Sequence, residues 1–321
     1  MSLGEMQKMV RDQLVIIDEI LAKRGSELIM RPLEAAIFFV EECIVEIKGD
    51  TKEDFAEKKW FADIYRWTYG WYRERYGDAL NDRKREYGKG IVRVYGTPFA
   101  LNVPLTVTED EDPGNTVWLI FPDSLMPDEI PTDWLHPKPN LEHLSLEDSK
   151  TLEQEIEFVT TSIRSIERSL STADYPAPSS QMLGGSIAAH VETAVQGILS
   201  GKREQVSVGL WELHLAMEKA LKLFLSQKSG TPPKTHDLGQ LRKLAEPHAE
   251  STILDSSFRD CPTATEAISY RYGENKSVSV EAAIQTYYAS LRIVRFYASA
   301  LDKTIIMNNA RFLLQKPPWA R

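Results

Sequence analysis

The most constraining feature of this sequence is the segment from Leu210 to Leu225, because its apolar side chains recur with the period of an α-helix. Glu218 and Lys222 lie four residues apart in this segment, in the order that favours an ion pair on a helix. A helix with one apolar stripe must bury that stripe against other elements, so the segment predicts a long packed helix. The stripe consists of Leu210, Leu213, Met217, Ala220, Leu221 and Phe224.

Two later segments continue the helical pattern. After Gly230 and a pair of prolines, Thr235 is a candidate cap of a further helix, and Asp237 lies in the first turn of that helix. The segment 267–273 is followed by a short loop and by a helix from about Val280 to Leu301. These patterns predict several helices in the last third of the chain.

Four short motifs follow one another in this region. They are Ala216–Lys222 (AMEKALK), Pro232–Leu238 (PPKTHDL), Arg271-Tyr272 and Glu281–Ala283 (EAA). In this order and spacing they resemble the HEPN family, over about residues 187 to 302. The resemblance implies a bundle of four or five helices that often dimerises. It also implies a setting in defence or in toxin–antitoxin pairs, with a partner protein such as a nucleotidyltransferase.

Many HEPN proteins are metal-independent ribonucleases, and their motif is an arginine, four to six residues and a histidine near the start of the last helix. The histidine exchanges protons near neutral pH, and the arginine stabilises charge on the phosphate in the transition state. The predicted last helix here contains no histidine. The catalytic candidates are therefore Arg242 and His248, which have this spacing but follow the His-Asp-Leu segment, with Pro247 between them. We expect a protein that is not an enzyme.

Arg271 and Tyr272 are the main candidates for ligand binding. Arginine offers a planar fork of donors to a phosphate, and tyrosine offers a ring on which a base can stack. The alternative is that Arg271 pairs with a carboxylate such as Glu218 and joins two helices. The resemblance implies that the two residues lie at the mouth of a groove with Glu218, Lys222 and His236. Asp237 is a further candidate for ligand binding.

A second interpretation of the same region is a metal site. His214 and Glu218 lie four residues apart on one helical face, and with His236 and Asp237 they have the side chains that bind a divalent metal. We instead expect hydrogen bonds between two helices, because the His-Asp pair recurs in a family that is not generally metal-dependent. The sequence therefore predicts no metal and no cofactor.

The first 144 residues predict a separate helical domain that carries a small antiparallel meander. Helical spacing occurs at 5–24 and 33–47 and in an aromatic-rich stretch at about 51–80. The pattern then changes to short β-type runs separated by turn residues, at 91–95, 101–107 and 116–121. Residues 122–144 are rich in proline and acidic residues, which predicts a linker or an irregular wrap.

Residues 145–186 predict a long helix followed by a linker, before a bundle at 187–321. Ser145 is the candidate cap of this helix. Its apolar residues are spaced alternately by four and three, and they pack either inside their own domain, which we favour, or in a dimeric coiled coil. Ser171–Gly185 has the composition of a linker. The seam consists of Leu152, Ile156, Val159, Ile163, Ile166 and Leu170. The predicted fold class is therefore mainly α.

Composition restricts the function further. The net charge is −9, so contact with nucleic acid requires a local basic patch. The stretch from Trp67 to Arg93 is basic and aromatic, but its interleaved acidic residues indicate a salt-bridged helix surface. No run of about 18 apolar residues exists, so we expect no membrane span. Cys43 and Cys261 lie far apart in the sequence, which predicts no disulfide and a cytoplasmic protein.

Together these features predict a non-catalytic binding module that recognises a nucleotide or RNA, or that pairs with a partner protein. The alternatives are a metal-independent ribonuclease and a structural protein whose role is dimerisation. We expect a homodimer that does not associate with membranes.

Overall fold

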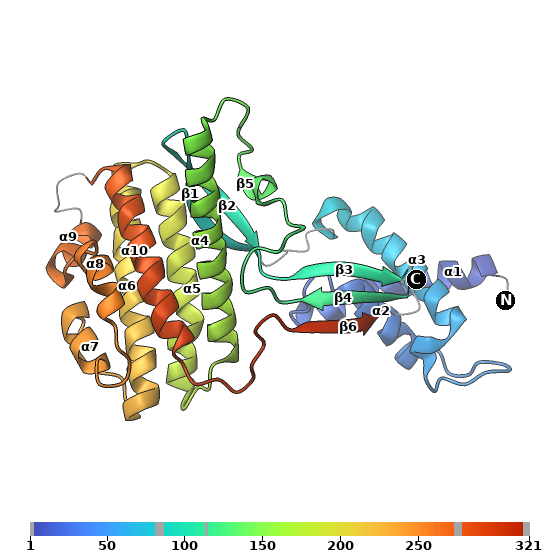
Figure 1. Ribbon diagram of the computed structural model, residues 1–321. Coiled ribbons are helices and arrows are strands. Elements are labelled where there is room, and N and C mark those ends of the chain that lie inside the picture. The colour runs from blue at the N-terminus through green and yellow to red at the C-terminus, as the bar shows by residue number, and fades with distance from the viewer. Residues whose placement is uncertain (1–2, 81–86, 113–114, 273–277, 317–321) are drawn as a thin grey trace. The chain divides into compact units, whose positions relative to one another are not determined.

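The computed structural model describes residues 3–80, 87–112, 115–272 and 278–316, and the chain divides into two compact units (Figure 1). The first unit consists of Met1–Arg85, Thr108–Leu119 and Phe312–Arg321, and the second of Glu86–Val107 and Ile120–Arg311. The predicted fold class, mainly α with a helical bundle in the C-terminal part, is confirmed. The predicted boundary at residue 144 does not coincide with a unit boundary, because strands that precede it belong to the second unit. Within the described ranges, no helix combines the length and the apolar character that a membrane crossing requires.

The first unit contains the predicted three-helix arrangement. Its helices are α1 (Leu3–Lys23), α2 (Arg31–Phe38) and α3 (Lys59–Tyr76), with a π-helical turn at Phe39–Cys43 and 3-10 turns at Phe55–Glu57 and Gly77–Leu80. The buried core is rich in aromatic side chains, as predicted. It includes Leu14, Ile17, Phe39, Phe61, Ile64, Trp71 and Tyr72.

The part of the basic and aromatic stretch that lies in α3, from Trp67 to Tyr76, contributes to this core and its surface, whereas the part in β1 belongs to the second unit. Trp71 and Tyr72 are buried, so their rings do not face solvent. Ion pairs join Arg66 to Asp63 at 2.7 Å and Arg11 to Glu74. These contacts agree with a salt-bridged helix surface; residues 81–86 of the stretch, with Arg83, Lys84 and Arg85, lie outside the described residues.

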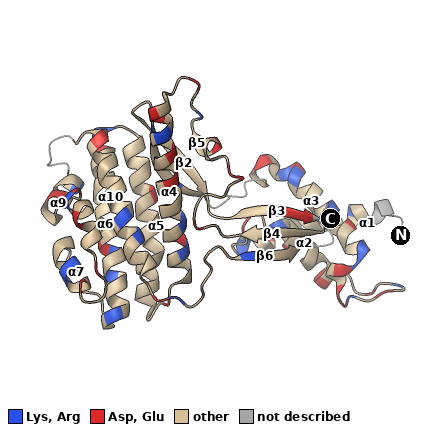
Figure 2. Ribbon diagram, viewed as in Figure 1, with Lys and Arg blue, Asp and Glu red and all other residues tan. Residues whose placement is uncertain are grey.

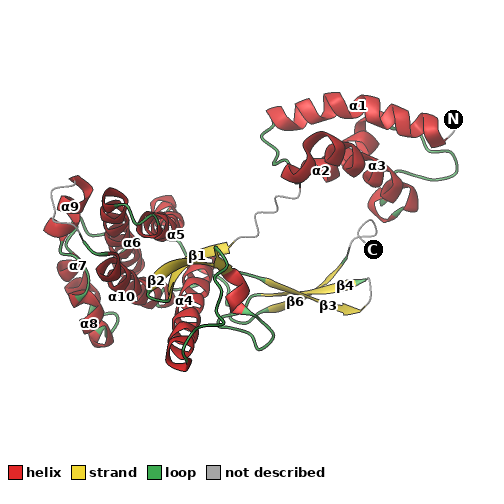
Figure 3. Cartoon of the chain, turned by 90° about the horizontal axis from the view of Figure 1, so that it is seen from above, coloured by secondary structure: helices red, strands yellow, loops and turns green. Residues whose placement is uncertain are grey.

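The predicted strands are present, but they belong to two three-stranded sheets. β1 (Tyr87–Val94), β2 (Thr97–Pro104) and β5 (Leu135–His136) form an antiparallel sheet in the order β1-β2-β5. β3 (Val107–Asp112), β4 (Thr116–Ile120) and β6 (Arg311–Gln315) form the second sheet, in which the three strands lie side by side (Figure 3).

The strands β3, β5 and β6 were not predicted, because the sequence indicated only three strands. β6 pairs antiparallel to β4. The amide of Phe121 donates to the carbonyl of Ala310 at 3.0 Å, and the amide of Lys316 donates to the carbonyl of Asn115 at 2.7 Å. The start of β6 thus lies beside the end of β4, and the end of β6 lies beside the start of β4. This sheet is completed by a segment from the far end of the sequence.

A bundle of long helices forms most of the second unit. α4 (Leu146–Thr172), α5 (Pro178–Leu199), α6 (Arg203–Ser229) and α10 (Val280–Ser299) run side by side (Figure 1). The short helices α7 (Leu238–Ala245), α8 (Asp255–Arg259) and α9 (Ala264–Tyr272) connect α6 to α10. The predicted apolar stripe of α6 is buried, and α6 contacts α5, α7, α9 and α10.

Glycines allow α5 and α6 to approach each other closely. A Cβ atom on Gly197 would lie 2.5 Å from the carbonyl oxygen of Gln205, and one on Gly209 would lie 2.9 Å from that of Ala194. Both distances are shorter than a van der Waals contact. The close packing of α5 on α6 therefore depends on these two glycines.

The heptad-like seam of α4 packs inside its own unit, as favoured from the sequence. All six seam residues from Leu152 to Leu170 are buried in the core of the second unit. Ser145 caps α4, because its Oγ accepts from the amide of Asp148 at 3.0 Å. A dimeric coiled coil through this seam, the alternative interpretation, is therefore excluded while the unit is folded.

The predicted linker at 171–185 is wrong for most of its length. α4 ends at Thr172 and α5 begins at Pro178. The hydroxyl of Tyr175 donates to the carbonyl of Leu170 at 2.5 Å, and a Cβ atom on Gly184 would lie 2.3 Å from that hydroxyl. The small residues of this segment allow close packing of a helix and do not mark a flexible connection.

Residues 122–144 are irregular apart from a 3-10 turn at Pro131–Trp134 and the strand β5, and two buried arginines of α4 hold this wrap in place. The side chain of Arg164 is fully buried. Its guanidinium donates to the carbonyls of Pro104 at 3.0 Å and Ser124 at 2.5 Å, and it pairs with the Glu129 carboxylate at 2.5 Å. Arg168 pairs with Asp123 in the same way. The wrap is thus an integral part of the second unit.

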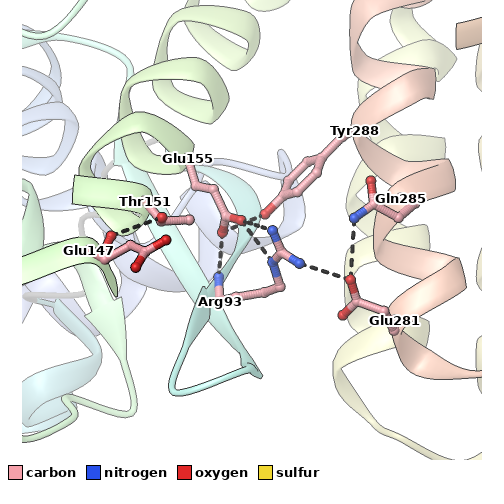
Figure 4. A network of polar contacts seen from close by, with 7 residues as sticks. All are labelled: Arg93, Glu147, Thr151, Glu155, Glu281, Gln285 and Tyr288. Carbon is pink, nitrogen blue, oxygen red and sulfur yellow. Dashed lines mark hydrogen bonds and ion pairs between the residues drawn. The ribbon is translucent and has the colours of Figure 1, made fainter. Parts of the chain in front are cut away.

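A polar network joins β1 to α4 and α10 (Figure 4). The backbone amide and Nε of Arg93 donate to Glu155 at 2.8 and 2.7 Å. The hydroxyl of Tyr288 donates to the same carboxylate at 2.8 Å, and Nη1 of Arg93 donates to Glu281 at 2.8 Å. Glu155 is buried, so its charge depends on these donors. The network fastens the β1-β2 strand pair to the bundle.

Candidate ligand-binding face on helix α6

One face of α6 brings most of the predicted site residues together. Positions 211, 214, 218 and 222 are separated by three and four residues, so their side chains lie along one side of the helix. Helices α7 and α9 pack against α6, and the residues before α7 and at the end of α9 complete the group. We call this group the α6 face, which consists of Trp211, His214, Glu218, Lys222, His236, Arg271 and Tyr272.

Glu218 is the acceptor at the centre of the α6 face. Its Oε1 atom accepts from Nζ of Lys222 at 2.8 Å and lies 2.9 Å from Nδ1 of His236. Glu218 is buried, whereas the His236 side chain is 74% exposed. The predicted Glu218–Lys222 ion pair is present, and the predicted approach of His236 is also observed.

Arg271 does not pair with Glu218, so the alternative in which it joins two helices through that carboxylate is wrong. Its guanidinium carbon lies 5.4 Å from the centre of the Trp211 ring and 5.7 Å from that of Tyr272. Among the described residues, no carboxylate lies within 4.0 Å of this guanidinium. Stacking on the indole orients the guanidinium and leaves its N–H groups available, because a cation–π contact uses the face of the group. Tyr272 is 66% exposed.

His214 is the buried member of the α6 face. Its ring stacks on that of Trp211, with the centres 6.0 Å apart and an angle of 11° between the planes. Burial lowers the pKa of His214 below its ordinary value, although the nearby Glu218 carboxylate opposes the shift. Its Nδ1 atom has no hydrogen-bond partner among the described residues. The lowered pKa keeps the imidazole neutral near pH 7. The neutral ring packs against the Trp211 indole.

Asp237, a predicted ligand-binding residue, caps helix α7. Its Oδ1 atom accepts from the amide of Gln240 at 2.8 Å, so Asp237 takes the capping role that we predicted for Thr235. Thr235 instead accepts from the amide of Asp237 at 3.2 Å. Within the described part of the chain, no three His, Cys, Asp or Glu residues are placed to hold a metal ion.

Arg242 and His248, the catalytic candidates, are not brought together into a site. Arg242 pairs with Asp255, donates to Oγ of Ser251 at 3.2 Å and lies over the Phe258 ring at 4.8 Å. His248 is exposed in the turn after α7. No contact among the described residues joins the two side chains, and the guanidinium of Arg242 is already used to fasten α7 to α8.

Trp211 was missed as a member of the site. Its position seven residues before Glu218 places it on the same helical face, and that spacing was the only available signal. Elsewhere in the second unit, acidic and basic residues are interspersed along the helices (Figure 2).

Comparison with known proteins supports the resemblance. The HEPN domain model matches residues 199–297, which include every residue of the α6 face, so the C-terminal part of the chain carries a HEPN domain. No family model matches the N-terminal part. No curated protein and no solved structure matches the chain. A HEPN domain indicates an RNA-related or nuclease-like function.

Proposed function

We propose that the HEPN domain of this chain is a non-catalytic module that binds a nucleotide or RNA at the α6 face. The observation that carries the proposal is the guanidinium of Arg271, which is held 5.4 Å over Trp211 without a carboxylate partner among the described residues. A planar guanidinium with free N–H groups binds a phosphate through two parallel hydrogen bonds.

The neighbour of Arg271 supplies the second element of recognition. Tyr272 is 66% exposed, so its ring can carry a base next to the phosphate held by Arg271. Bases are available for stacking in single strands and are not available in a duplex. The proposed ligand is therefore a nucleotide or single-stranded RNA.

The positive charge at the α6 face comes mainly from Arg271. Lys222 donates to Glu218 at 2.8 Å, so the acidic partner offsets its charge. His236 contacts the same carboxylate and projects into solvent, where it can donate to a second phosphate or to a base edge. Arg271 should consequently contribute more to affinity than either residue.

Fluorescence anisotropy of a labelled 5′-phosphorylated single-stranded RNA tests this proposal with the full chain. Arg271→Gln should weaken binding about tenfold or more, because a hydrogen bond to a charged group contributes about 1.5–3 kcal/mol. The same change should lower the slope of log affinity against log salt by about one. Tyr272→Ala should weaken binding by the loss of one stacked base, about 1–3 kcal/mol.

The matched control is Arg259→Gln, which removes a positive charge from an exposed residue of α8 outside the α6 face. It should leave the affinity nearly unchanged at moderate salt. If Arg271→Gln and Arg259→Gln have the same effect, the α6 face is not the binding site.

A ribonuclease is the second candidate, and one observation favours it. His236 is 74% exposed while its Nδ1 atom lies 2.9 Å from the buried Glu218 carboxylate, which is the arrangement of a histidine oriented for proton transfer. Incubation of the protein with structured RNA and EDTA distinguishes the two candidates. Our proposal expects intact RNA; cleavage that persists in EDTA and is lost in His236→Ala would establish the enzyme instead.

Homodimer formation, a partner protein such as a nucleotidyltransferase, and a cytoplasmic location stay predictions. Because the α4 seam is buried in its own unit, a dimer must use another surface. Light scattering on the full chain tests the predicted dimer directly.

A further inference from the structure

A second surface of the bundle has the features of a small-ligand site. A hollow of about 550 Å³ lies beside α10 and shares no residue with the α6 face. Its volume falls within the range of about 300–1,000 Å³ that is typical of small-molecule sites. The residues that matter here are Phe158 of α4, Ile253 and Leu254 of the turn before α8, and Arg292, Arg295 and Phe296 of α10.

Arg292 and Arg295 give this hollow its positive charge. They lie three residues apart on α10 and both line the hollow, so one anion in the hollow can contact both side chains. No carboxylate of a described residue lies within 4.0 Å of either group, and none of the lining residues is acidic. By contrast, Arg93, Arg164 and Arg242 of the same unit each pair with a carboxylate. Two unpaired arginines side by side repel each other, and an anion removes that cost.

The remaining walls are apolar. The guanidinium carbon of Arg292 lies 4.8 Å from the centre of the Phe158 ring, so a cation–π contact restrains this donor at the wall that Phe158 forms. Phe296 and Leu254 supply apolar surface, and Ile253 is 79% exposed at the edge. A ligand that covers these side chains gains free energy from the apolar area removed from water.

We propose that this hollow, the α10 pocket, binds a small organic anion with a flat apolar body. The anionic group binds Arg292 and Arg295, and the body packs against Phe296, Leu254 and Ile253. Organic phosphates and organic carboxylates share this chemistry. The proposal is independent of the function proposed for the α6 face, because the two sites have no residue in common.

Isothermal titration calorimetry on the full chain tests the α10 pocket with four probes. 1-Naphthyl phosphate and 1-naphthoate have the same body and different anionic groups, 1-naphthol lacks the charge, and inorganic phosphate lacks the body. At least one of the two naphthyl anions should bind at least about tenfold more tightly than 1-naphthol and inorganic phosphate. A preference for the phosphate or for the carboxylate identifies the natural class of ligand.

Variants connect the binding to the two arginines. Arg292→Gln and Arg295→Gln should each weaken the better anion about tenfold, whereas Arg259→Gln and Arg271→Gln should not change its affinity. Ile253→Asp places a negative charge at a well-exposed edge position that should not disturb folding, and it should weaken the anion as well. The proposal is overturned if neither naphthyl anion binds, if 1-naphthol binds equally well, or if Arg292→Gln, Arg295→Gln and Ile253→Asp leave the affinity unchanged.

Discussion

Removal of the buried Arg164 guanidinium should destabilise the second unit strongly. In Arg164→Met the Glu129 carboxylate, whose side chain is only 9% exposed, loses its ionic partner, and the carbonyls of Pro104 and Ser124 lose a donor. Removal of one partner of a buried ion pair lowers the free energy of unfolding by about 3–5 kcal/mol. For a unit of this size, 1 kcal/mol lowers the unfolding midpoint by about 2–4 °C, so the expected decrease is about 6–20 °C.

Thermal unfolding followed by far-ultraviolet circular dichroism measures this decrease. The control is Lys138→Met, which removes one partner of the exposed pair Lys138–Asp133 in the same wrap and should cost no more than about 1 kcal/mol. Adding Glu129→Gln to Arg164→Met should recover part of the loss, because the orphaned charge is removed. A midpoint for Arg164→Met that equals that of Lys138→Met would show that the buried pair does not hold the wrap.

Two further predictions concern pH and helix packing. Because burial lowers the pKa of His214, the unfolded chain binds a proton that the folded chain does not as the pH falls below about 6.5. The stability of the second unit should therefore decrease with acidification from about pH 6.5, and urea titrations should show a smaller decrease in His214→Gln; an unchanged pH profile in the variant would contradict this assignment. Gly209→Ala should destabilise the unit by about 1–3 kcal/mol, since its Cβ would lie 2.9 Å from the Ala194 carbonyl. Gly185→Ala in α5, where a Cβ meets nothing within 4 Å, should stabilise it by about 0.5–1 kcal/mol, and equal effects at the two glycines would refute the close-approach argument.

The periodicity of apolar residues predicted those parts of the fold that depend on residues close together in the sequence. The α6 stripe and the α4 seam are buried where their spacing placed them, and the Ser145 cap is present. The Glu218–Lys222 pair also follows from spacing on one helix. His236 and Arg271 were expected near Glu218 and Lys222 because of the motif order, since spacing alone cannot bring separate helices together.

The features that sequence reasoning missed depend on partners that are distant in the sequence. The division of the strands into two sheets depends on β6, which pairs with β4 from the far end of the chain. Arg242 contacts Ser251 and Asp255, and both partners lie beyond its own helix. These contacts occupy its guanidinium, which was a catalytic candidate. The composition of segment 171–185 is compatible with a flexible linker and with a closely packed helix. The close approach of Tyr175 to Gly184, which the sequence does not reveal, shows that the helix is the correct interpretation.

Photocrosslinking identifies whether RNA or a nucleotide binds at the α6 face. Single-stranded RNA that contains 4-thiouridine is irradiated with the full chain, and the crosslinked residues are identified by mass spectrometry. If RNA binds at the α6 face, crosslinks form at Tyr272 or Trp211, disappear in Arg271→Gln and persist in Arg259→Gln. Crosslinks confined to the aromatic residues of the first unit, or crosslinks at the α6 face that persist in Arg271→Gln, would show that RNA binds elsewhere or without Arg271.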